Sequence, residues 1–418
     1  MIQKTFLFFA LLITAQHFAQ KQQASPYSFF GMGNNFLAKT VEENMMGATG
    51  TALSVPGNLN FSNPAAQTNM RFTTYSLGVI NTLNEISDGT NKQRSSLFSL
   101  SYLGMGIPLG NKGGITGGLR ARTGVGYTLY GENEDMTSDL TFEGSGGASS
   151  LFLSAGYQIF KGFSLGAEAS YVFGQIEHVV TEVQDGITYD TREKSVSDLR
   201  GLEAKLGMFY TKRVGKTKNL NLGLTVVPES TINVTETSSF YKLSDSDIND
   251  FPRKTLEPVT VKGSVTTPLN TTMAIAYGKA SVWQSSFEYS YNKAQQYTGQ
   301  TLLNNTRGVV YTDYSRMSFG GYYIPKFNSL TSYFQRVVYR AGIKYEDLGM
   351  QLQGNALKDV GISFGVGLPL GKGLTHLNIG AEYGVKGSVI EGLVEEKYFN
   401  VRMSISLGDK WFNKRRIN

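Results

Sequence analysis

Apolar and polar residues alternate over most of the chain, from about residue 71 to residue 411. The segment Tyr398–Leu407 shows the pattern clearly, with Phe, Val, Met, Ile and Leu at every second position and Asn, Arg and Ser between them. Because successive side chains of a β-strand point to opposite faces, this alternation predicts strands with one apolar and one polar face. Many such strands behind a secretory signal are typical of a transmembrane β-barrel.

The alternating runs predict an all-β fold, a single transmembrane antiparallel β-barrel of about 14 strands over residues 69–412. About 9–11 tilted residues cross the hydrocarbon layer, so every run is long enough. An even number of strands also places both ends of the barrel on one side of the membrane. The strands are expected near residues 69–80, 94–108, 112–127, 148–159, 162–177, 199–212, 219–236, 263–277, 281–292, 311–324, 334–345, 359–369, 373–385 and 397–411.

The connections between these strands differ in charge. Six short connections carry nine Lys or Arg residues and no Asp or Glu, whereas the longer connection 128–147 carries five acidic residues and no basic one. Bacterial barrels have short periplasmic turns and longer outer loops, so the basic rim is expected on the periplasmic side. The formal net charge of +6 is explained by this sidedness, and no nucleic-acid partner is expected.

The two ends of the chain are expected to lie outside the barrel. Lys4, the apolar run 6–13 and the small and polar residues after it are typical of a secretory signal, so residues 1–20 are expected to be removed. Residues 413–418 form a short basic tail. The chain contains no Cys, so neither a lipid anchor nor a disulfide is expected. An exported membrane protein without long apolar helices must be a closed barrel, which indicates the outer membrane of a Gram-negative cell.

Placing the apolar face toward lipid leaves many charges facing the lumen. A lipid-facing Arg or Lys near the midplane would cost about 2–4 kcal/mol, so the inward orientation is strongly favoured. One interpretation is an ion-paired interior; another is that Arg336, Arg340 and Lys344, spaced to share one face of a strand, bind an anionic head group. The lumen-facing candidates are Arg120, Arg122, Glu168, Glu203, Lys205, Glu288, Arg316, Arg336, Arg340, Lys344, His376, Glu382 and Arg402.

The second predicted strand is partly apolar on both faces. Phe98 and Tyr102 are therefore expected in the lumen, where they contact either a hydrophobic ligand or a plug. Irregular backbone is expected at other strands because Gly inside a strand often marks a bulge or bend and Pro removes a ladder donor. The candidates for such kinks are Gly117, Gly118, Gly124 and Pro228.

Residues 21–68 do not alternate and contain compact turn-forming elements with several aromatic residues. A segment of this size before a wide barrel is expected to lie inside it. The stretch Gly47-Ala-Thr-Gly-Thr-Ala-Leu-Ser, followed by Ser62-Asn-Pro-Ala-Ala, resembles the N-terminal hatch of the FadL-type outer-membrane transporters. The opening Ser25-Pro-Tyr-Ser and residues 380–384 resemble the branch found in Bacteroidetes. The matching hatch positions are Gly47, Gly50, Ala52, Asn63, Pro64 and Ala65.

The resemblance implies passive uptake of hydrophobic or amphipathic small molecules, such as long-chain fatty acids. In that family the ligand binds apolar pockets above the hatch, the hatch shifts, and the ligand leaves laterally into the bilayer where the third strand kinks. The implied partners are the outer-membrane lipid bilayer and a hydrophobic small molecule. An alternative remains, since some FadL-like barrels of Bacteroidetes serve the type IX secretion system by binding cargo protein, and acidic outer loops suit that role.

No enzymatic activity is expected. The stretch Gly361-Ile-Ser-Phe-Gly365 formally matches a nucleophile elbow, but that motif requires a sharp strand-to-helix turn and Ser363 lies within a regular alternation. His178 and His376 are the only histidines after the signal, and neither lies beside a nucleophile motif. No metal-ligand cluster and no phosphate-binding loop is recognisable, so neither a metal nor a cofactor is expected.

Overall fold

The computed structural model describes residues 24–132, 138–184, 189–244, 253–254, 256–302, 308–370 and 375–409. The predicted secretory signal and basic tail lie outside these residues. The described residues contain no helix that is long and apolar enough to span a membrane.

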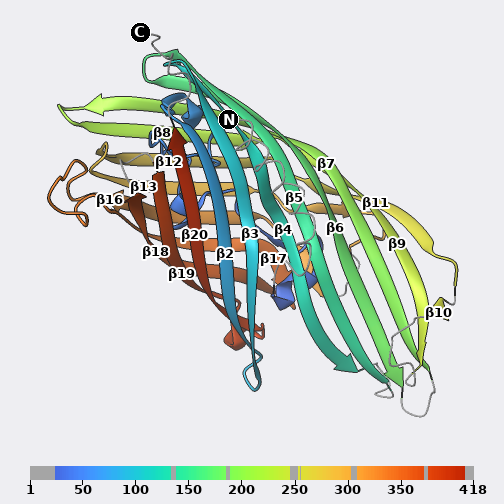
Figure 1. The fold of residues 1–418 in the computed structure, drawn as a ribbon. Coiled ribbons are helices and arrows are strands. Elements are labelled where there is room, and N and C mark those ends of the chain that lie inside the picture. The colour runs from blue at the N-terminus through green and yellow to red at the C-terminus, as the bar shows by residue number, and fades with distance from the viewer. Residues whose placement is uncertain are drawn as a thin grey trace, which may run out of the picture.

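A single antiparallel sheet closes on itself to form the barrel, because β2 pairs with β3 on one edge and with β20 on the other (Figure 1). The predicted all-β barrel of about fourteen strands is confirmed, with four of the strands interrupted. The strands are β2 Thr73–Ser87, β3 Lys92–Leu109, β4 Gly113–Glu132, β5 Ser138–Phe160, β6 Phe163–Gln184, β7 Tyr189–Val214, β8 Lys218–Val227 with β9 Ser230–Ser244, β11 Val259–Thr267 with β12 Asn270–Lys279, β13 Trp283–Asn292 with β14 Gln296–Thr298, β15 Val309–Tyr311 with β16 Tyr314–Tyr323, β17 Val338–Leu352, β18 Asn355–Leu370, β19 Thr375–Lys386 and β20 Glu395–Asp409. The short β10, Arg253–Lys254, pairs with β9.

Several strands extend well beyond the predicted bounds. Most of the expected outer loops 128–147 and 178–198 belong to strands, and β7 reaches 26 residues. The outer face of β6 changes along the strand from Tyr171 and Phe173 to Gln175 and Glu177. Acidic residues are tolerated there because the outer face of this part meets water rather than lipid. The expectation of long acidic loops was therefore wrong: the wall itself continues past the lipid-facing band.

Proline marks two of the interruptions. β8 ends before Pro228 and β9 begins at Ser230, while β11 and β12 are separated by Pro268 and Leu269. Proline has no backbone N–H to donate to the neighbouring strand, so the ladder breaks where it occurs.

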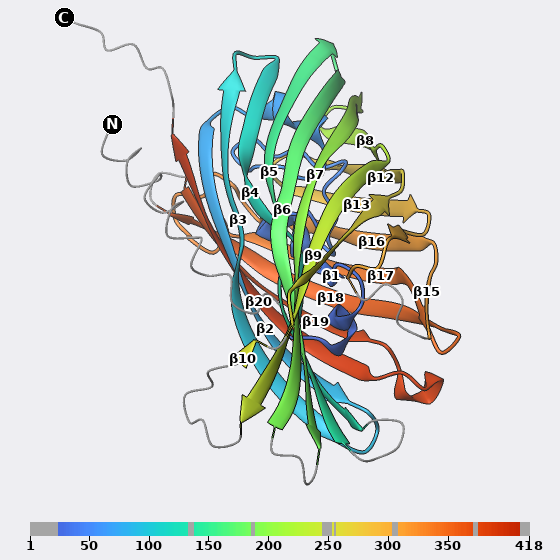
Figure 2. The same ribbon diagram turned by 90° about the vertical axis from the view of Figure 1, so that its right-hand side faces the viewer.

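The N-terminal segment, defined here as residues 24–72, runs between the two sides of the barrel wall (Figures 1 and 2, dark blue). It contains the short elements η2 Pro26–Phe29, β1 Asn34–Asn35, α2 Val41–Asn44 and η3 Pro64–Asn69. A capping box between Thr40 and Glu43 begins α2. Much of the segment is buried, with Phe61 at 1% and Ala65 at 0% exposure.

Inward-facing glycines allow the backbone of this segment to lie directly against the wall. A Cβ atom on Gly320 would lie 2.1 Å from the carbonyl oxygen of Met46, and one on Gly223 would lie 2.1 Å from that of Thr51. Such distances leave no room for any side chain, so these wall positions require glycine. The members of this glycine band are Gly114, Gly156, Gly166, Gly207, Gly223, Gly320 and Gly342.

Gly342→Ala should lower the thermal stability of the purified barrel, because its Cβ would lie 2.2 Å from the backbone nitrogen of Gly47. Overpacking of this kind typically costs about 1–3 kcal/mol. The measurement is the thermal unfolding midpoint in detergent. Gly131→Ala is the matched control, since the nearest atom to its Cβ would be 3.8 Å away. Equal midpoints for the two variants would contradict close packing of the segment against the wall.

Candidate functional site

A buried carboxylate on the wall anchors the N-terminal segment. Glu288 on β13 is 0% exposed and accepts hydrogen bonds of 2.9 Å from the backbone N–H groups of Gly50 and Thr51. Its other oxygen lies 2.6 Å from Lys39 Nζ and 2.9 Å from Arg316 Nη2. A carboxylate removed from water is stable only when it is paired and hydrogen-bonded, and this one satisfies both conditions.

The acidic residues of α2 extend the attachment. Glu42 accepts hydrogen bonds from Asn378 on β19 at 2.8 Å and from Ser406 on β20 at 3.2 Å. Glu43 instead accepts a 2.7 Å hydrogen bond from Ser62 within the segment. Burial raises the pKa of Glu43 and lowers the pKa of Lys39 from their ordinary values. The segment is therefore fastened to β13 and, several strands away, to β19 and β20 by charged groups that have little access to solvent.

The motif Asn63-Pro-Ala fastens the other end of the segment. The side chain of Asn63 caps η3 by accepting from Ala65 N–H at 2.9 Å. Its amide group donates to the carbonyl oxygens of Thr51 and of Met208 on β7, each at 2.9 Å. One side chain thus links η3, the small-residue stretch and the wall. The remaining predicted hatch positions, Gly47, Ala52 and Pro64, also lie against inward-facing wall residues.

The barrel wall is divided between β3 and β4. Their pairing runs from Leu109↔Gly113 to Tyr102↔Arg120 and no further. Beyond this point β4 contains a bulge between Ala121 and Thr123 and pairs with β1, as Asn34↔Gly124 and Asn35↔Thr123. Among the described strands, none pairs with the corresponding edge of β3, residues 92–101. We call this place the β3–β4 split.

The first residues of the N-terminal segment span the inner side of the β3–β4 split. The Ser25 N–H donates to the carbonyl oxygen of Gly126 on β4 at 2.8 Å, and the Ser25 hydroxyl donates to Glu396 on β20 at 2.5 Å. The Ser28 hydroxyl accepts from Gly126 N–H at 3.0 Å. We call residues 25–36 the latch. They lie along the edge of β4 beyond the bulge, whereas β3 occupies the same edge nearer the β3–β4 turn.

An apolar cluster fills the lumen next to the latch, from the level of the outer residues Tyr171 and Phe173 to that of Gln175 and Glu177. Phe29 of the latch packs edge-on against Tyr127, with ring centroids 5.1 Å apart. Met32 and Leu302 complete the cluster from the lumen side. Its buried members are Met32, Val125, Tyr127, Ala148, Val172, Ile176, Leu199, Ile232, Val234, Val265 and Leu302.

The structure favours the ion-paired interpretation of the lumen charges. Lys344 lies 2.9 Å from Glu382 and 3.2 Å from Asp359, and Arg340 donates to Asn378 at 3.0 Å. Arg336 does not share their strand: it precedes β17 in a turn, with its guanidinium 5.3 Å from the ring centre of Tyr333. The predicted row of three cations was wrong because β17 begins only at Val338.

The two aromatic candidates of β3 point in opposite directions. A register shift in the β2–β3 pairing adds one residue between Leu100 and Tyr102 and reverses the alternation. Tyr102 is 2% exposed and packs edge-on against Phe61 of the N-terminal segment, 5.0 Å between ring centroids. Phe98 is 68% exposed on the outer face, so its predicted place in the lumen was wrong.

The glycines of β4 differ in surroundings. A Cβ on Gly117 would face the outer residue Leu153 at 3.4 Å, whereas one on Gly118 would lie 2.2 Å from the carbonyl oxygen of Leu103. Gly124 pairs with β1 beside the bulge.

Sequence reasoning identified Glu288 and Arg316 only as lumen charges and did not identify Lys39 as their partner. The signal that could have identified Lys39 is that it is a single Lys in an N-terminal segment with few charged residues.

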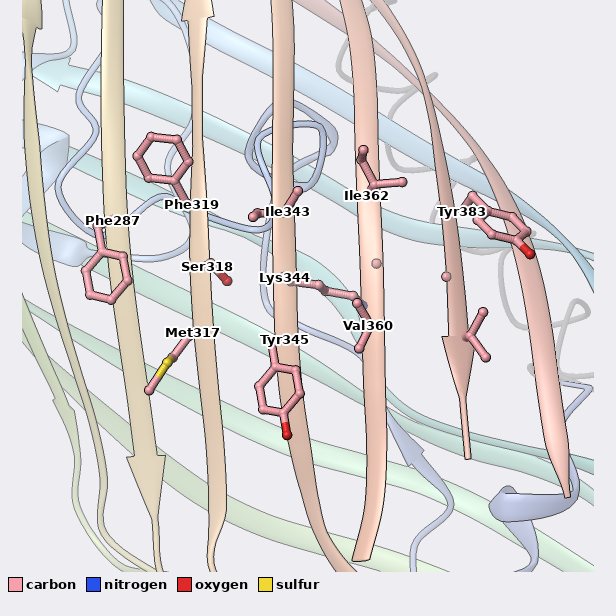
Figure 3. A pocket seen from close by; sticks show the side chains of 13 residues that line it. Phe287, Met317, Ser318, Phe319, Ile343, Lys344, Tyr345, Val360, Ile362 and Tyr383 are labelled. Atoms are coloured by element: carbon pink, nitrogen blue, oxygen red, sulfur yellow. The ribbon is translucent and has the colours of Figure 1, made fainter. Parts of the chain in front are cut away.

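A hollow of about 460 Å³ on the wall does not belong to this site. Figure 3 shows Phe287, Phe319, Ile343 and Ile362 around it, from β13, β16, β17 and β18. These side chains are between 42% and 53% exposed on the outer face. In a membrane barrel that face contacts acyl chains, so the hollow is part of the lipid-facing surface rather than the lumen.

Glu288→Gln should loosen the N-terminal segment, because the amide leaves two buried cations without their counter-charge. Hydrogen bonds to a charged acceptor contribute about 1.5–3 kcal/mol, so amide exchange at Gly50 and Thr51 should rise roughly 10- to 100-fold. Hydrogen–deuterium exchange with mass spectrometry measures this. Glu395→Gln, which removes a partly exposed pair with Lys397, is the control. Unchanged protection in the Glu288 variant would show that the anchor lies elsewhere.

Solved structures resemble this chain in fold. It aligns with the toluene transporter TbuX of Ralstonia pickettii at 14% identity and a TM-score of 0.62, covering 89% of this chain and 99% of that one. It aligns with the toluene transporter TodX of P. putida at 15% identity and a TM-score of 0.62, covering 90% of this chain and 100% of that one. It aligns with a FadL homologue of Pseudomonas aeruginosa at 12% identity and a TM-score of 0.56, covering 90% of this chain and 98% of that one. The predicted FadL-type fold is thereby confirmed, whereas the Bacteroidetes branch stays a prediction.

A search of curated proteins found no match. A family model does match, and it covers residues 1–418 under the description BamG. This match includes the N-terminal segment and every strand of the barrel. The chain belongs to the BamG family.

Proposed function

We propose that the chain is an outer-membrane channel for the passive uptake of hydrophobic or amphipathic small molecules, with lateral release into the bilayer. The observation that carries the proposal is the β3–β4 split, which lies beside the apolar cluster and is covered on its inner side by the latch. The split therefore connects the apolar lumen with the hydrocarbon layer of the bilayer. The predicted secretory signal accounts for export across the inner membrane, and the barrel fold accounts for residence in the outer membrane.

The depth of the split follows from strand register. Phe98 and Leu100 on β3 pair with Asn81 and Val79 on β2, which in turn pair with Val401 and Met403 on β20. Met403 is 41% exposed on the outer face. The part of the unpaired β3 edge around Phe98 and Leu100 therefore lies level with lipid-facing residues. A ligand that passes the latch here moves from an apolar lumen into hydrocarbon, a transfer favoured by the hydrophobic effect.

We propose that movement of the latch alone opens this route. The central part of the N-terminal segment has its own attachments, to Glu288 and the glycine band of the wall and, through Asn63, to Met208. The latch is attached by backbone hydrogen bonds to β4, by the contacts of Ser25 and Ser28, and by the buried side chains of Tyr27 and Met32. We therefore assign the movement of the predicted hatch to residues 25–36 and a fixed, supporting role to the remainder.

The ligand class is supported by the lining and by the relatives. The cluster consists of aliphatic and aromatic side chains, and the toluene transporters share the fold at full length. Toluene and a long-chain fatty acid are accordingly the first probes. Because passage is not coupled to an energy source, each probe should move down its own concentration gradient.

A disulfide that fixes the latch should block uptake. The chain has no Cys, so the double variant Asn35→Cys and Thr123→Cys introduces the only pair, at positions that are strand partners. We expect oxidation to reduce the uptake of radiolabelled toluene or oleate by Gram-negative cells producing the chain, and reduction to restore it. The control is Ser264→Cys with Thr298→Cys, also strand partners, in β11 and β14. Uptake that oxidation of the latch pair leaves unchanged would contradict release past the latch.

The alternative role in type IX secretion stays a prediction. It depended on acidic outer loops, and the described parts of those segments are mainly strands, so no observation among the described residues favours it over transport. It also makes a distinct claim: loss of the gene should leave cargo proteins in the periplasm. Normal secretion in such a mutant would remove the alternative.

A further inference from the structure

The connection between β16 and β17, residues 324–337, is an ordered loop on the rim formed by the short turns (Figure 1, orange, beside β16). Lys326 N–H donates to the carbonyl oxygen of Gln335 at 2.8 Å, which closes the base of the loop. Turns within the loop add hydrogen bonds from Ser329 to Lys326 and from Arg336 to Tyr333. The described short turns elsewhere on this rim, at 110–112, 161–162, 215–217 and 280–282, contain two or three residues each.

This loop presents large apolar side chains at its surface. Leu330 is 101% exposed, Phe334 is 74% exposed and Phe327 is 61% exposed. Three large apolar side chains within eight residues of one loop are thus exposed on one rim, and water solvates such surface poorly. The backbone that carries them is hydrogen-bonded, so the exposure is a built feature of the loop rather than a consequence of missing contacts.

The patch is continuous with the lipid-facing surface. Tyr339 on β17 is strand partner to Tyr323 on β16, which is strand partner to Trp283 on β13, and Tyr323 and Tyr339 are exposed on the outer face. Such aromatic residues are typical of the boundary between head groups and hydrocarbon. The hydroxyl of Tyr339 donates to the carbonyl oxygen of Phe334 at 3.2 Å, so the loop bends toward the lipid side of the rim and not over the lumen.

Positive charge accompanies the apolar patch. Lys326 lies exposed at the base of the loop, and the Arg336 guanidinium is held over the ring of Tyr333, whose hydroxyl donates to the carbonyl oxygen of Pro369 at 3.2 Å. Apolar residues that enter the acyl boundary, with Lys and Arg at the level of phosphate groups, are the usual composition of an interfacial anchor.

We propose that residues 326–336 bind the bilayer interface, with Phe327, Leu330 and Phe334 in the acyl boundary and Lys326 and Arg336 beside lipid phosphates. The contact fixes the depth of β16 and β17 in the membrane. It is independent of what the lumen transports. A protein partner on the same patch is the competing occupant, and it would leave these side chains in water when the barrel is alone in lipid.

Depth-dependent quenching of tryptophan fluorescence tests the proposal. In a background with Trp283→Phe and Trp411→Phe, the full chain carries either Phe334→Trp or Leu330→Trp and is reconstituted into phosphatidylcholine vesicles with brominated acyl chains. We expect both probes to lose fluorescence in brominated vesicles and to resist quenching by aqueous iodide. The control is Ile390→Trp, a residue that is 98% exposed in η4, Val389–Glu391, at the opposite rim, and it should be quenched by iodide alone.

Quenching of both loop probes by iodide, without loss of fluorescence in brominated vesicles, would overturn the proposal and point to a protein partner. Folding of each variant is checked by the heat-dependent migration of the barrel in gels. Phe334→Trp replaces one aromatic residue by another, so it keeps the loop intact if Leu330→Trp does not.

Discussion

The arrangement inside this barrel depends on the attachment of the N-terminal segment to a carboxylate that has no access to water. Glu288 compensates two cations, Lys39 from the segment and Arg316 from the wall, and accepts two backbone hydrogen bonds. Removing any one partner leaves an uncompensated buried group, which is why such an assembly tolerates little change. The glycine band then brings backbone against backbone, so that the segment and the wall pack without intervening side chains.

The division of the wall follows from the same arrangement. A strand has two edges, and beyond the bulge near Arg122 one edge of β4 is taken by the N-terminal segment. β3 consequently has no partner on this edge over residues 92–101, and around Phe98 and Leu100 the open edge lies at a depth where it is costly in lipid. The latch covers the inner side of this opening through Ser25 and Ser28. The anchored N-terminal segment and the β3–β4 split are thus two results of one strand exchange.

The sequence predicted the barrel well and the interior less well. Alternation is a local signal, so Phe399 to Leu407 could be assigned to the lipid face without knowing their neighbours. Phe98 could not, because a single extra residue in β3 reverses every side chain beyond it and leaves no mark in the pattern. The strand extensions were missed because the outer face becomes polar where it leaves the lipid, as at Glu177.

Glu288 was expected in the lumen, but its pairing with Lys39 joins residues 249 positions apart. The inward glycines, such as Gly320 and Gly342, were a readable signal of close approach by another backbone.

Hydrogen–deuterium exchange of the wild-type barrel in lipid, with and without saturating toluene, tests the central claim most directly. The claim is that the N-terminal segment has a fixed centre and a movable latch. It predicts that toluene accelerates exchange in residues 25–36 while the amides of residues 47–53 remain protected. Acceleration of both parts together, or of neither, would contradict it.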